Sequence, residues 1–502
     1  MSIRVSARRP RPGLRRRIES LVLRWQARLD AAWADRVGPW VAASVLFVVF
    51  FALALGRAHS FDAGTPLATY VQAAWLIDHG HDADVTVAGA HLLSLRAPIG
   101  FYPLAMVTRV LPIIPTLLGA QAAALALGAV PLWRIARQVA RLRMGAAIAL
   151  LVAYGANPAV NNLNLADFHP ETLALPALLA AAYFGLLQRW RPFALACLLV
   201  VAWSAELGLV VAGLGLLLAL EGHGRQGLRT AAFGVAWTVV AIVVLERRVG
   251  ASTVVELDAF ADYGDGAIGV LGAMLANPFR VVADLFAEAN VGVIVGLFAP
   301  VLFLPVVAPR YLIPAIPLQA VYLVADVPLS GPEGAHFTVP AVAFCFVAAA
   351  FALARIGRRS TDRVLVDRRL LAALAVAAVG FWVVDAGSSP YREPWARGRR
   401  DRVDQARIAS IDVVGESSRL RASPSLLPHL AERRFVYALE AGERPDVGAV
   451  LAGGPTEVVS DDRAVPRWSV SEQLDLGTGL AGAGYQLVYR AQGVSVYSRG
   501  GS

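Results

Sequence analysis

The sequence predicts an all-α polytopic membrane protein that ends in a small α/β domain on the outer side. Of its 502 residues, 57% are hydrophobic and only 17% are charged, whereas a soluble chain would carry about 25% charged residues. Apolar runs long enough to cross a bilayer recur through most of the chain, up to about residue 387. Beyond it, the composition changes to alternating strand-like and helix-like stretches. We therefore expect three parts: a basic cytoplasmic segment (1–37), a transmembrane domain (38–387) and an extracytoplasmic domain (388–502).

The first segment is strongly basic. All 46 basic residues of the chain are arginines, and residues 1–36 hold ten of them against three acids, most of the net charge of +9. Residues 14–36 place leucine, isoleucine and tryptophan at spacings of three and four, which predicts an amphipathic helix on the inner leaflet. This arginine excess indicates a cytoplasmic membrane surface, so we expect no nucleic-acid partner.

The membrane segments follow from the apolar runs and the arginine bias. The runs are 38–57, 113–134, 144–160, 171–188, 192–220, 228–248, 290–308, 311–327, 337–356 and 369–386. As one helix, 192–220 would be about 43 Å long, too long for a hydrocarbon core of about 30 Å. We expect a hairpin of two short helices broken near Ser204-Ala205-Glu206, which places every arginine-rich loop inside. This gives about eleven membrane segments in the bacterial plasma membrane, with the N-terminus cytoplasmic and the C-terminal domain outside.

A polar island separates two apolar runs: Asn161-Asn162-Leu163-Asn164-Leu165-Ala166-Asp167-Phe168-His169-Pro170-Glu171. Pro170 suits the first position of a helix, His169 would be its N-cap, and Glu171 would lie in the favourable first turn. A helix start explains these residues but not why Asp167 and His169 crowd the same turn. Both a capping role and a functional site remain open.

Other ionisable residues near the membrane are also candidates. Asp62 follows the first span and is either a loop acid or a reactive carboxylate, and Glu206 stands in the middle of an apolar run, where an acid is expensive. His336 begins another span and is either an interfacial or a binding histidine. The run His79-Gly80-His81-Asp82-Ala83-Asp84 has no regular element to hold a metal, and Gly264-Asp265-Gly266-Ala267-Ile268-Gly269 lacks the βαβ context of a dinucleotide site. The two cysteines exclude a disulfide framework and a cysteine-based zinc site.

The C-terminal domain is predicted from short strand patterns. Strands are expected at 435–437 and 456–459, a helix at 425–433, and a hairpin at 485–498 that turns at Gln492-Gly493. We find no clustered histidine or carboxylate pattern there, so we expect the domain to cap the membrane cavity rather than perform chemistry.

Residues 60–345, and loosely the tail, resemble a bacterial family of predicted multispanning membrane proteins of unknown function, which is similar to the GT-C superfamily of membrane glycosyltransferases. The most specific element is Asp167-Phe168-His169-Pro170-Glu171, supported by Phe61-Asp62-Ala63-Gly64 and Gln72-Ala73-Ala74-Trp75. Two positions depart from the family pattern. Ser204-Ala205-Glu206 stands where a Lys-Glu-Asp-like triplet is common, and Arg96 stands near a frequent histidine.

The resemblance implies a glycosyltransferase that transfers a sugar from a polyprenyl-phosphate-linked donor to an envelope glycan or glycolipid acceptor on the outer face. A carboxylate must take the acceptor's proton, and a positive charge must stabilise the departing lipid phosphate. The candidate catalytic residues are Asp62, Asp167, His169, Glu171 and Glu206. The candidate substrate-binding residues are Gln72, Arg96, Asn164 and His336. A divalent ion, Mg or Mn, is expected to use Asp62 or His169.

Two alternatives remain. A transporter or flippase would show repeats and several midplane charges, and a non-catalytic assembly or lipid-binding protein would tolerate the Ser204-Ala205-Glu206 departure. The catalytic hypothesis makes a geometric prediction: Asp62, Asp167, His169 and Glu206 should converge on one cavity open to the outside, because sharing water, a metal or one another lowers the desolvation penalty of each.

Overall fold

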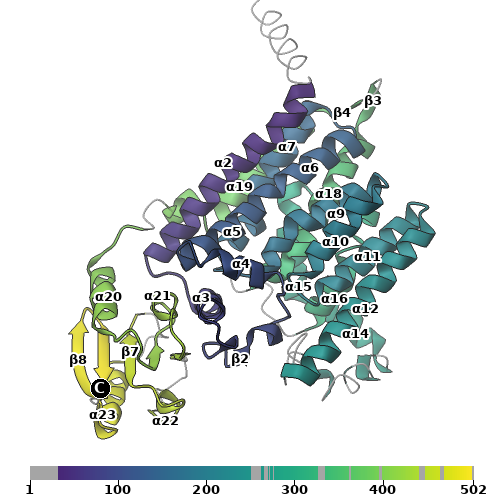
Figure 1. Cartoon of the computed structure of the whole chain (residues 1–502). Helices are drawn as coiled ribbons and strands as arrows, with labels where there is room; N and C mark the ends of the chain where they lie inside the picture. Colours follow the sequence, from purple (N-terminus) through teal and green to yellow (C-terminus); the bar gives the residue numbers. More distant parts are fainter. Residues whose placement is uncertain are drawn as a thin grey trace, which may run out of the picture.

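The computed structural model describes residues 32–249, 260, 262–264, 270, 272–274, 276–325, 334–360, 363–394, 398–439, 447–463 and 469–499. These residues form a bundle of apolar helices with a five-stranded sheet at one end (Figure 1). Most of the amphipathic helix predicted at 14–36, and most of the glycine-rich run 264–269, lie outside the described residues.

The bundle is built from helices of very different length. Its α-helices are α2 (Ala32–His59), α3 (Thr65–Asp78), α4 (Phe101–Val107), α5 (Ile113–Leu127), α6 (Ala129–Arg134), α7 (Met144–Gly155), α8 (Pro158–Leu165), α9 (Leu175–Leu186), α10 (Trp190–Val201), α11 (Leu207–Leu220), α12 (Gly224–Val249), α14 (Pro278–Leu285), α15 (Glu288–Phe298), α16 (Ile316–Val324), α18 (Val339–Ile356) and α19 (Arg368–Asp385). Short 3-10 turns connect several of them, including η1 (Leu92–Ser94), η3 (Pro170–Ala174), η7 (Pro309–Leu312) and η8 (Ala335–Thr338).

The lengths and compositions of these helices fit a membrane protein. Among the described residues, four helices are long and apolar enough to cross a bilayer, or up to six if each of two bent helix pairs counts as one span. The bends are 41° between α7 and α8 and 49° between α14 and α15. Three further apolar helices are shorter: Pro170–Leu186, Trp190–Val201 and Leu207–Leu220. The last two are the arms of the hairpin predicted in 192–220, and their break at residues 202–206 contains Ser204-Ala205-Glu206 as expected.

Small residues let α11 and α12 pack closely. A Cβ built on Gly227 would lie 2.7 Å from the backbone nitrogen of Ala219, so any larger side chain there forces the helices apart. Close approach through small residues is the usual basis of helix packing in membranes, where apolar burial gives little drive.

Arginine-rich loops gather at the end of the bundle away from the sheet, here called the arginine-rich end (Figure 1). Buried Arg137 donates from Nε to Asp35 Oδ1 at 2.6 Å, which ties the start of α2 to the segment after α6. The hairpin of β3 (Arg358–Ser360) and β4 (Arg363–Leu365) bonds to the same segment. This clustering agrees with the arginine bias from which the loop assignment was made.

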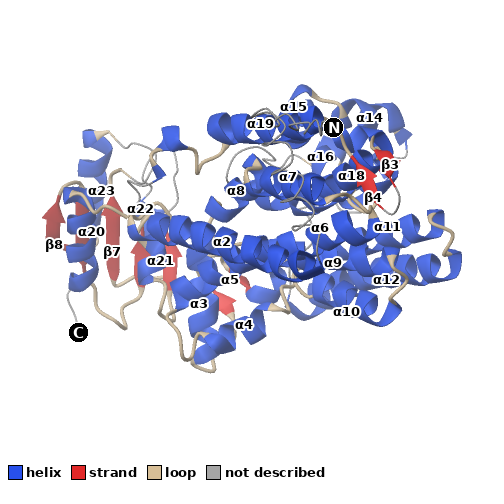
Figure 2. Cartoon of the chain, turned by 90° about the horizontal axis from the view of Figure 1, so that it is seen from above, coloured by secondary structure: helices blue, strands red, loops and turns tan. Residues whose placement is uncertain are grey.

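The C-terminal region is a mixed sheet flanked by helices (Figure 2). Its elements are α20 (Arg402–Val413), β5 (Leu420–Ala422), α21 (Leu427–Leu430), β6 (Val436–Ala438), α22 (Val447–Leu451), β7 (Glu457–Asp461), α23 (Val470–Gly482), β8 (Gln486–Ala491) and β9 (Val494–Ser498). The strand order is β6-β5-β7-β9-β8, with β5 parallel to both neighbours and β9 antiparallel to both of its own. The predicted strands are confirmed, and β8 and β9 turn at Gln492-Gly493, where both residues have positive φ.

One apolar core joins this region to the bundle. Buried side chains of α3, such as Leu67 and Val71, belong to the same cluster as Leu427 and Leu430 of α21. Gln72 adds a polar clamp: its Nε2 donates to Thr86 Oγ1 at 2.8 Å and to the Arg434 carbonyl at 3.1 Å. The sheet is therefore held against the end of the bundle that carries the polar island.

Candidate active site

The first polar cluster, here the Arg96 cluster, consists of Arg96, Glu171 and Glu206. Arg96 Nη1 lies 3.5 Å from Glu206 Oε1 and 3.6 Å from Glu171 Oε1. Its backbone has φ +65°, a conformation that a non-glycine residue rarely adopts, and its carbonyl accepts a 2.8 Å bond from the Ala205 nitrogen. The break between α10 and α11 therefore fixes both the arginine and one of its acids.

The Arg96 cluster has unused hydrogen-bonding capacity. Several buried oxygen atoms make no hydrogen bond of standard geometry with the described residues. They are Ser204 Oγ, Thr172 Oγ1, both carboxylate oxygens of Glu206, and Glu171 Oε2. Buried polar atoms are normally paired, so this cluster is suited to receive water or the polar group of a ligand. The Arg96 guanidinium rests on the Phe337 ring at 4.6 Å, which holds it without using its N–H donors.

Two histidines stack beside this cluster. The rings of His169 and His336 are 4.1 Å apart and nearly parallel, at 14°. Burial, and to a smaller extent the charge of Arg96, lowers the pKa of His169 to about 3, although the hydrogen bond to the Ala166 carbonyl opposes this shift. The imidazole is therefore neutral. One of its nitrogens can accept a hydrogen bond, and the other can donate one.

The polar island begins a helical segment, but not as a simple cap. His169 precedes the 3-10 turn η3, Pro170 lies in its first turn, and α9 follows from Leu175. The His169 side chain makes no capping bond; instead its backbone nitrogen donates to Gln121 Oε1 at 2.9 Å. The helix-start hypothesis is thus correct for Pro170, while the imidazole is left for other contacts.

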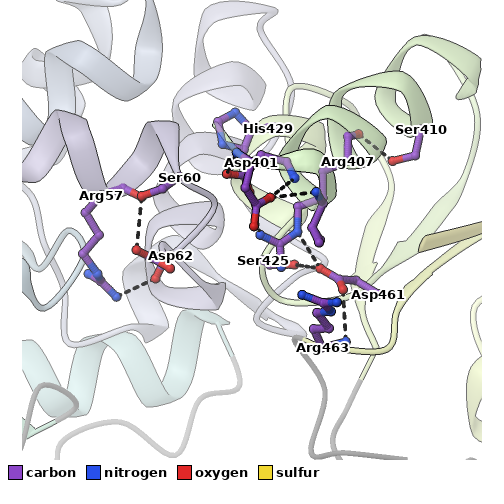
Figure 3. Close-up of polar contacts among 12 residues, drawn as sticks. Arg57, Ser60, Asp62, Asp401, Arg407, Ser410, Ser425, His429, Asp461 and Arg463 are labelled. Carbon is purple, nitrogen blue, oxygen red and sulfur yellow. Dashed lines mark hydrogen bonds and ion pairs between the residues drawn. The ribbon is translucent and has the colours of Figure 1, made fainter. Parts of the chain in front are cut away.

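The second polar cluster, here the Arg57 cluster, consists of Arg57, Asp62 and Asp167 (its Arg57 and Asp62 appear in Figure 3). Buried Asp167 accepts from Arg57 Nη1 at 2.6 Å and from the Gly64 nitrogen at 2.9 Å. Arg57 also donates to the carbonyls of Leu165 and Asp62, the latter at 2.7 Å. Burial raises the pKa of Asp167, whereas Arg57 and the Gly64 N–H oppose that rise. Asp167 thereby anchors the loop that presents Asp62.

The structure brings the predicted residues together as two clusters. Glu206 is buried and faces Arg96, and the segment 167–171 supplies both clusters with an acid. Asp62 is exposed, and its carboxylate accepts from Ser60 Oγ at 3.1 Å (Figure 3). It therefore does not share the buried surroundings of Glu206, as the single-cavity prediction required: a loop acid directly after a span stays in contact with solvent.

Two predicted substrate-binding amides have structural partners. Gln72 is fully buried, and besides its donor bonds its Oε1 accepts from the Val87 nitrogen at 3.0 Å. Asn164 is buried in α8 and donates to the Phe50 carbonyl of α2 at 2.9 Å. Both belong to the packing around the site, whereas Arg96 and His336 lie in it.

A further polar network was missed by the sequence analysis. Fully buried Asp461, at the end of β7, accepts from Arg407 Nε at 2.8 Å and from Ser425 Oγ at 2.9 Å (Figure 3). This is an ion-paired network around one aspartate, not a cluster of histidines or carboxylates, and the fold builds it from residues that are far apart in the sequence. Sequence patterns give no signal for such a pairing.

This network reaches the loop of Asp62. The Arg407 guanidinium lies 5.6 Å from the centre of the Phe61 ring, and the His429 ring packs against Phe61 with the ring centres 4.6 Å apart and the planes tilted by 51°. His429 Nε2 also lies 3.1 Å from the Ala58 carbonyl. Since Phe61 has φ +56°, these contacts hold a strained residue directly before Asp62.

Arg57 was also missed, although a signal for it exists. It ends the first span on the side that the arginine bias assigns to the outside, where an arginine is the exception. An arginine in that position is explained by a local acidic partner, here Asp167.

The donor set for a metal ion is sparse. Among the described residues, no group of three or more histidine, cysteine, aspartate or glutamate side chains is arranged to hold an ion. Asp62 lies in the Arg57 cluster and His169 lies beside the Arg96 cluster, so these two side chains do not form a shared metal site.

Comparisons with known proteins agree with this architecture. No curated protein matches the chain in sequence. The crystal structure of ArnT from Cupriavidus metallidurans bound to undecaprenyl phosphate matches with a TM-score of 0.56 and 14% identity, over 94% of this chain and 99% of that one. The apo form of the same protein matches with a TM-score of 0.55 and 13% identity, over 93% and 98%. These likenesses concern the fold and support the predicted GT-C-like architecture. The model of the family described as "Predicted membrane protein (DUF2079)" matches residues 59–496, so the chain belongs to that family of membrane proteins.

Proposed function

We propose that this protein is a GT-C-type membrane glycosyltransferase that transfers a sugar from a polyprenyl-phosphate-linked donor to an envelope glycan or glycolipid. The observation that carries the proposal is the Arg96 cluster: a fixed guanidinium beside buried polar atoms that make no hydrogen bond of standard geometry with the described residues. The fold of the whole chain adds support, since it resembles a protein solved with undecaprenyl phosphate.

In this proposal, Arg96 binds the lipid phosphate. As the glycosidic bond breaks, negative charge grows on the departing phosphate, and a guanidinium already held in place stabilises it without reorganisation. Glu171 and Glu206 lie beyond hydrogen-bond range at 3.6 and 3.5 Å, so they orient Arg96 while leaving donors for the phosphate. Neutral His169 can donate a hydrogen bond to the same group.

Asp62 is the proposed general base. Its exposure lets an acceptor hydroxyl approach, and the Ser60 and Arg57 contacts hold its loop. The carboxylate takes the acceptor proton as the new glycosidic bond forms. The acceptor oxygen bonds to the anomeric carbon as the bond from that carbon to the lipid phosphate breaks, so the proposal requires the sugar of the bound donor to extend from Arg96 toward Asp62.

Binding of undecaprenyl phosphate to the purified full-length protein tests the first step. Arg96→Gln removes a charge-assisted contact worth about 1.5–3 kcal/mol, so affinity should fall by about tenfold or more. Arg96→Lys keeps the charge and should retain part of the binding, which separates lost recognition from misfolding. The matched control is Arg109→Gln. Arg109 is exposed, and its Nε lies 3.1 Å from Asp78 Oδ1, so this variant should bind the lipid like wild type.

Envelope glycan and glycolipid analysis of a deletion strain tests the reaction. Complementation by wild type should restore a glycan that Asp62→Asn does not restore. A strain whose envelope is unchanged by the deletion, with lipid binding intact in the protein, would favour the lipid-binding alternative. Restoration by Asp62→Asn would remove this residue from the mechanism.

A further inference from the structure

A large cavity opens at the arginine-rich end, far from the two polar clusters described above. It encloses about 960 Å³ and is lined by residues 139–141, 308–311, 351, 354–355, 359 and 363–364. Five arginines contribute to its wall: Arg141, Arg310, Arg355, Arg359 and Arg363. Neither the family match nor the fold comparison assigns a role to this end of the molecule.

The positive charge in this cavity is only partly balanced. Arg310 Nε lies 3.4 Å from Glu221, and Arg363 Nη2 lies 3.8 Å from Asp35. Within the described part of the chain, Arg141, Arg355 and Arg359 form no ion pair with an acid, and Arg355 donates instead to the Val307 carbonyl at 2.9 Å. The cavity thus has a surplus of guanidinium groups, which prefer phosphate oxygens as partners.

The arginines are held by a fixed framework. The β3–β4 hairpin is tied to the segment after α6 by two backbone bonds, Val364 N to Arg141 O at 2.9 Å and Arg143 N to Val364 O at 3.1 Å. Arg358 and Arg359 are neighbours on β3 and line different cavities, because successive strand residues point to opposite faces. The concentration of charge is therefore built by the hairpin rather than by chance on a loose loop.

The cavity also has an apolar wall. The Tyr311 and Phe351 rings stack at 3.7 Å, and Val139, Ala308 and Ala354 line the cavity beside them. Phe351 and Ala354 belong to α18, one of the helices long and apolar enough to cross a bilayer. A ligand in this cavity meets both arginine side chains and apolar side chains, and α18 contributes to each kind through Arg355 and Phe351.

We infer that this cavity binds the phosphate headgroup of an anionic membrane lipid from the leaflet at the arginine-rich end. The guanidinium groups hold the phosphate, and the aromatic pair contacts the first part of the acyl chains. The general excess of arginine at one membrane face sets orientation through loop charge alone. Lipid binding of the kind inferred here requires in addition a headgroup held in this one cavity, and it is independent of the proposed glycosyl transfer.

The test compares two full-length variants with equal charge removed from the same end. In the first, Arg141→Gln, Arg355→Gln and Arg359→Gln are combined. In the control, Arg189→Gln, Arg191→Gln and Arg225→Gln are combined; these arginines are exposed and do not line the cavity. The measurement is native mass spectrometry of protein in detergent with dioleoyl phosphatidylglycerol, with dioleoyl phosphatidylcholine as the neutral competitor.

Wild type and the control should retain phosphatidylglycerol at least tenfold better than phosphatidylcholine, and the cavity variant should lose that preference. Equal loss in both triple variants would show a general charge effect and overturn the inference, as would an unchanged cavity variant. Displacement of phosphatidylglycerol by millimolar inorganic phosphate would show a site for the free anion instead of a lipid. The single variant Arg359→Gln, on a surface strand, repeats the comparison if the triple variant misfolds; it should weaken the preference, and no change would overturn the inference.

Discussion

At the scale of single residues, the site depends on ionisable groups whose surroundings differ sharply. Asp167 is buried against Arg57, Glu206 is buried against Arg96, and Asp62 remains exposed one loop away. Burial makes the first two sensitive to removal of their partners, since a buried charge without a partner is strongly unfavourable. Asp62 is exposed, so a substrate can reach it, and replacing it should change the free energy of unfolding very little.

Replacing Asp167 should therefore destabilise the protein much more than replacing Asp62. Asp167→Asn breaks the ion pair with Arg57, whose side chain is 20% exposed, and weakens the bond from Gly64. We expect a loss of about 2–3 kcal/mol in unfolding free energy, against less than about 0.5 kcal/mol for Asp62→Asn. Thermal unfolding in detergent measures both, and similar midpoints for the two variants would contradict the anchoring role of Asp167.

His169 should make stability depend on pH. Its pKa is lowered to about 3 in the folded state, below the ordinary value of 6.5, so the unfolded chain binds more protons between these values. Stability should consequently fall as pH decreases from 6.5 toward 3, by up to about 1.4 kcal/mol per pH unit from this group. His169→Gln should flatten that part of the profile, whereas His59→Gln, at an exposed position, should not. A wild-type slope in His169→Gln would argue against burial of a neutral ring.

At the scale of elements, the α10–α11 hairpin and its packing on α12 position the Arg96 cluster. The break at residues 202–206 supplies Glu206 and the Ala205 nitrogen that fixes the Arg96 backbone. On the other side, Thr238 of α12 donates to the Ala205 carbonyl at 3.0 Å. The separation of α11 and α12 is therefore part of the site geometry.

A methyl group between these two helices should disturb both stability and the site. Gly227→Ala would place a Cβ 2.7 Å from the Ala219 nitrogen, an overlap that backbone movement must relieve, and we expect a loss of about 1–3 kcal/mol. Gly224→Ala on the same helix meets no atom within 4 Å and is the matched control. Unfolding midpoints in detergent provide the comparison; equal values would show that the helices adjust freely.

At the scale of the whole molecule, the C-terminal sheet and the helical bundle share a core and a set of polar clamps. Thr86 Oγ1 donates to the Val436 carbonyl at 2.6 Å and lies 3.0 Å from the Val436 nitrogen, while Phe61 packs against His429. These contacts join β6 and α21 to the loops that surround Asp62. Docking of the sheet thereby sets the position of the proposed base.

Loosening one clamp should loosen the edge of the sheet. Thr86→Val keeps the side-chain volume but removes the hydroxyl that bonds both polar groups of Val436, so hydrogen exchange at the Val436 amide should accelerate at least tenfold. Thr116→Val, whose hydroxyl bonds only its own helix, should leave that exchange unchanged. No acceleration in Thr86→Val would mean that the apolar core alone holds the edge.

The orientation of the molecule gives a further prediction. With the arginine-rich end in the cytoplasm, a reporter that fluoresces only in the cytoplasm should stay dark when fused after Ser502. A reporter fused before Ala32 should be bright in the same cells. A bright C-terminal fusion would reverse the proposed orientation and place the Asp62 loop inside.

The sequence by itself determined the membrane character, the break in 192–220, the mixed C-terminal region and its final hairpin. Each of these depends on composition, periodicity or turn residues within a short window, which physical rules can evaluate locally. The island also directed attention to Asp167, His169 and Glu171. Local rules identified these side chains as chemically suitable candidates, but they did not predict which of them contact one another.

Only the tertiary structure decided which of these residues meet. Arg96 contacts Glu171 and Glu206 from a residue with positive φ, and Asp461 contacts Arg407 across an interval of 54 positions. Such pairs depend on how whole helices and strands pack, because long-range packing overcomes local conformational preference and supplies the burial that makes a pairing favourable. The exposure of Asp62 and the burial of Glu206 were settled in the same way, by what packs around each carboxylate.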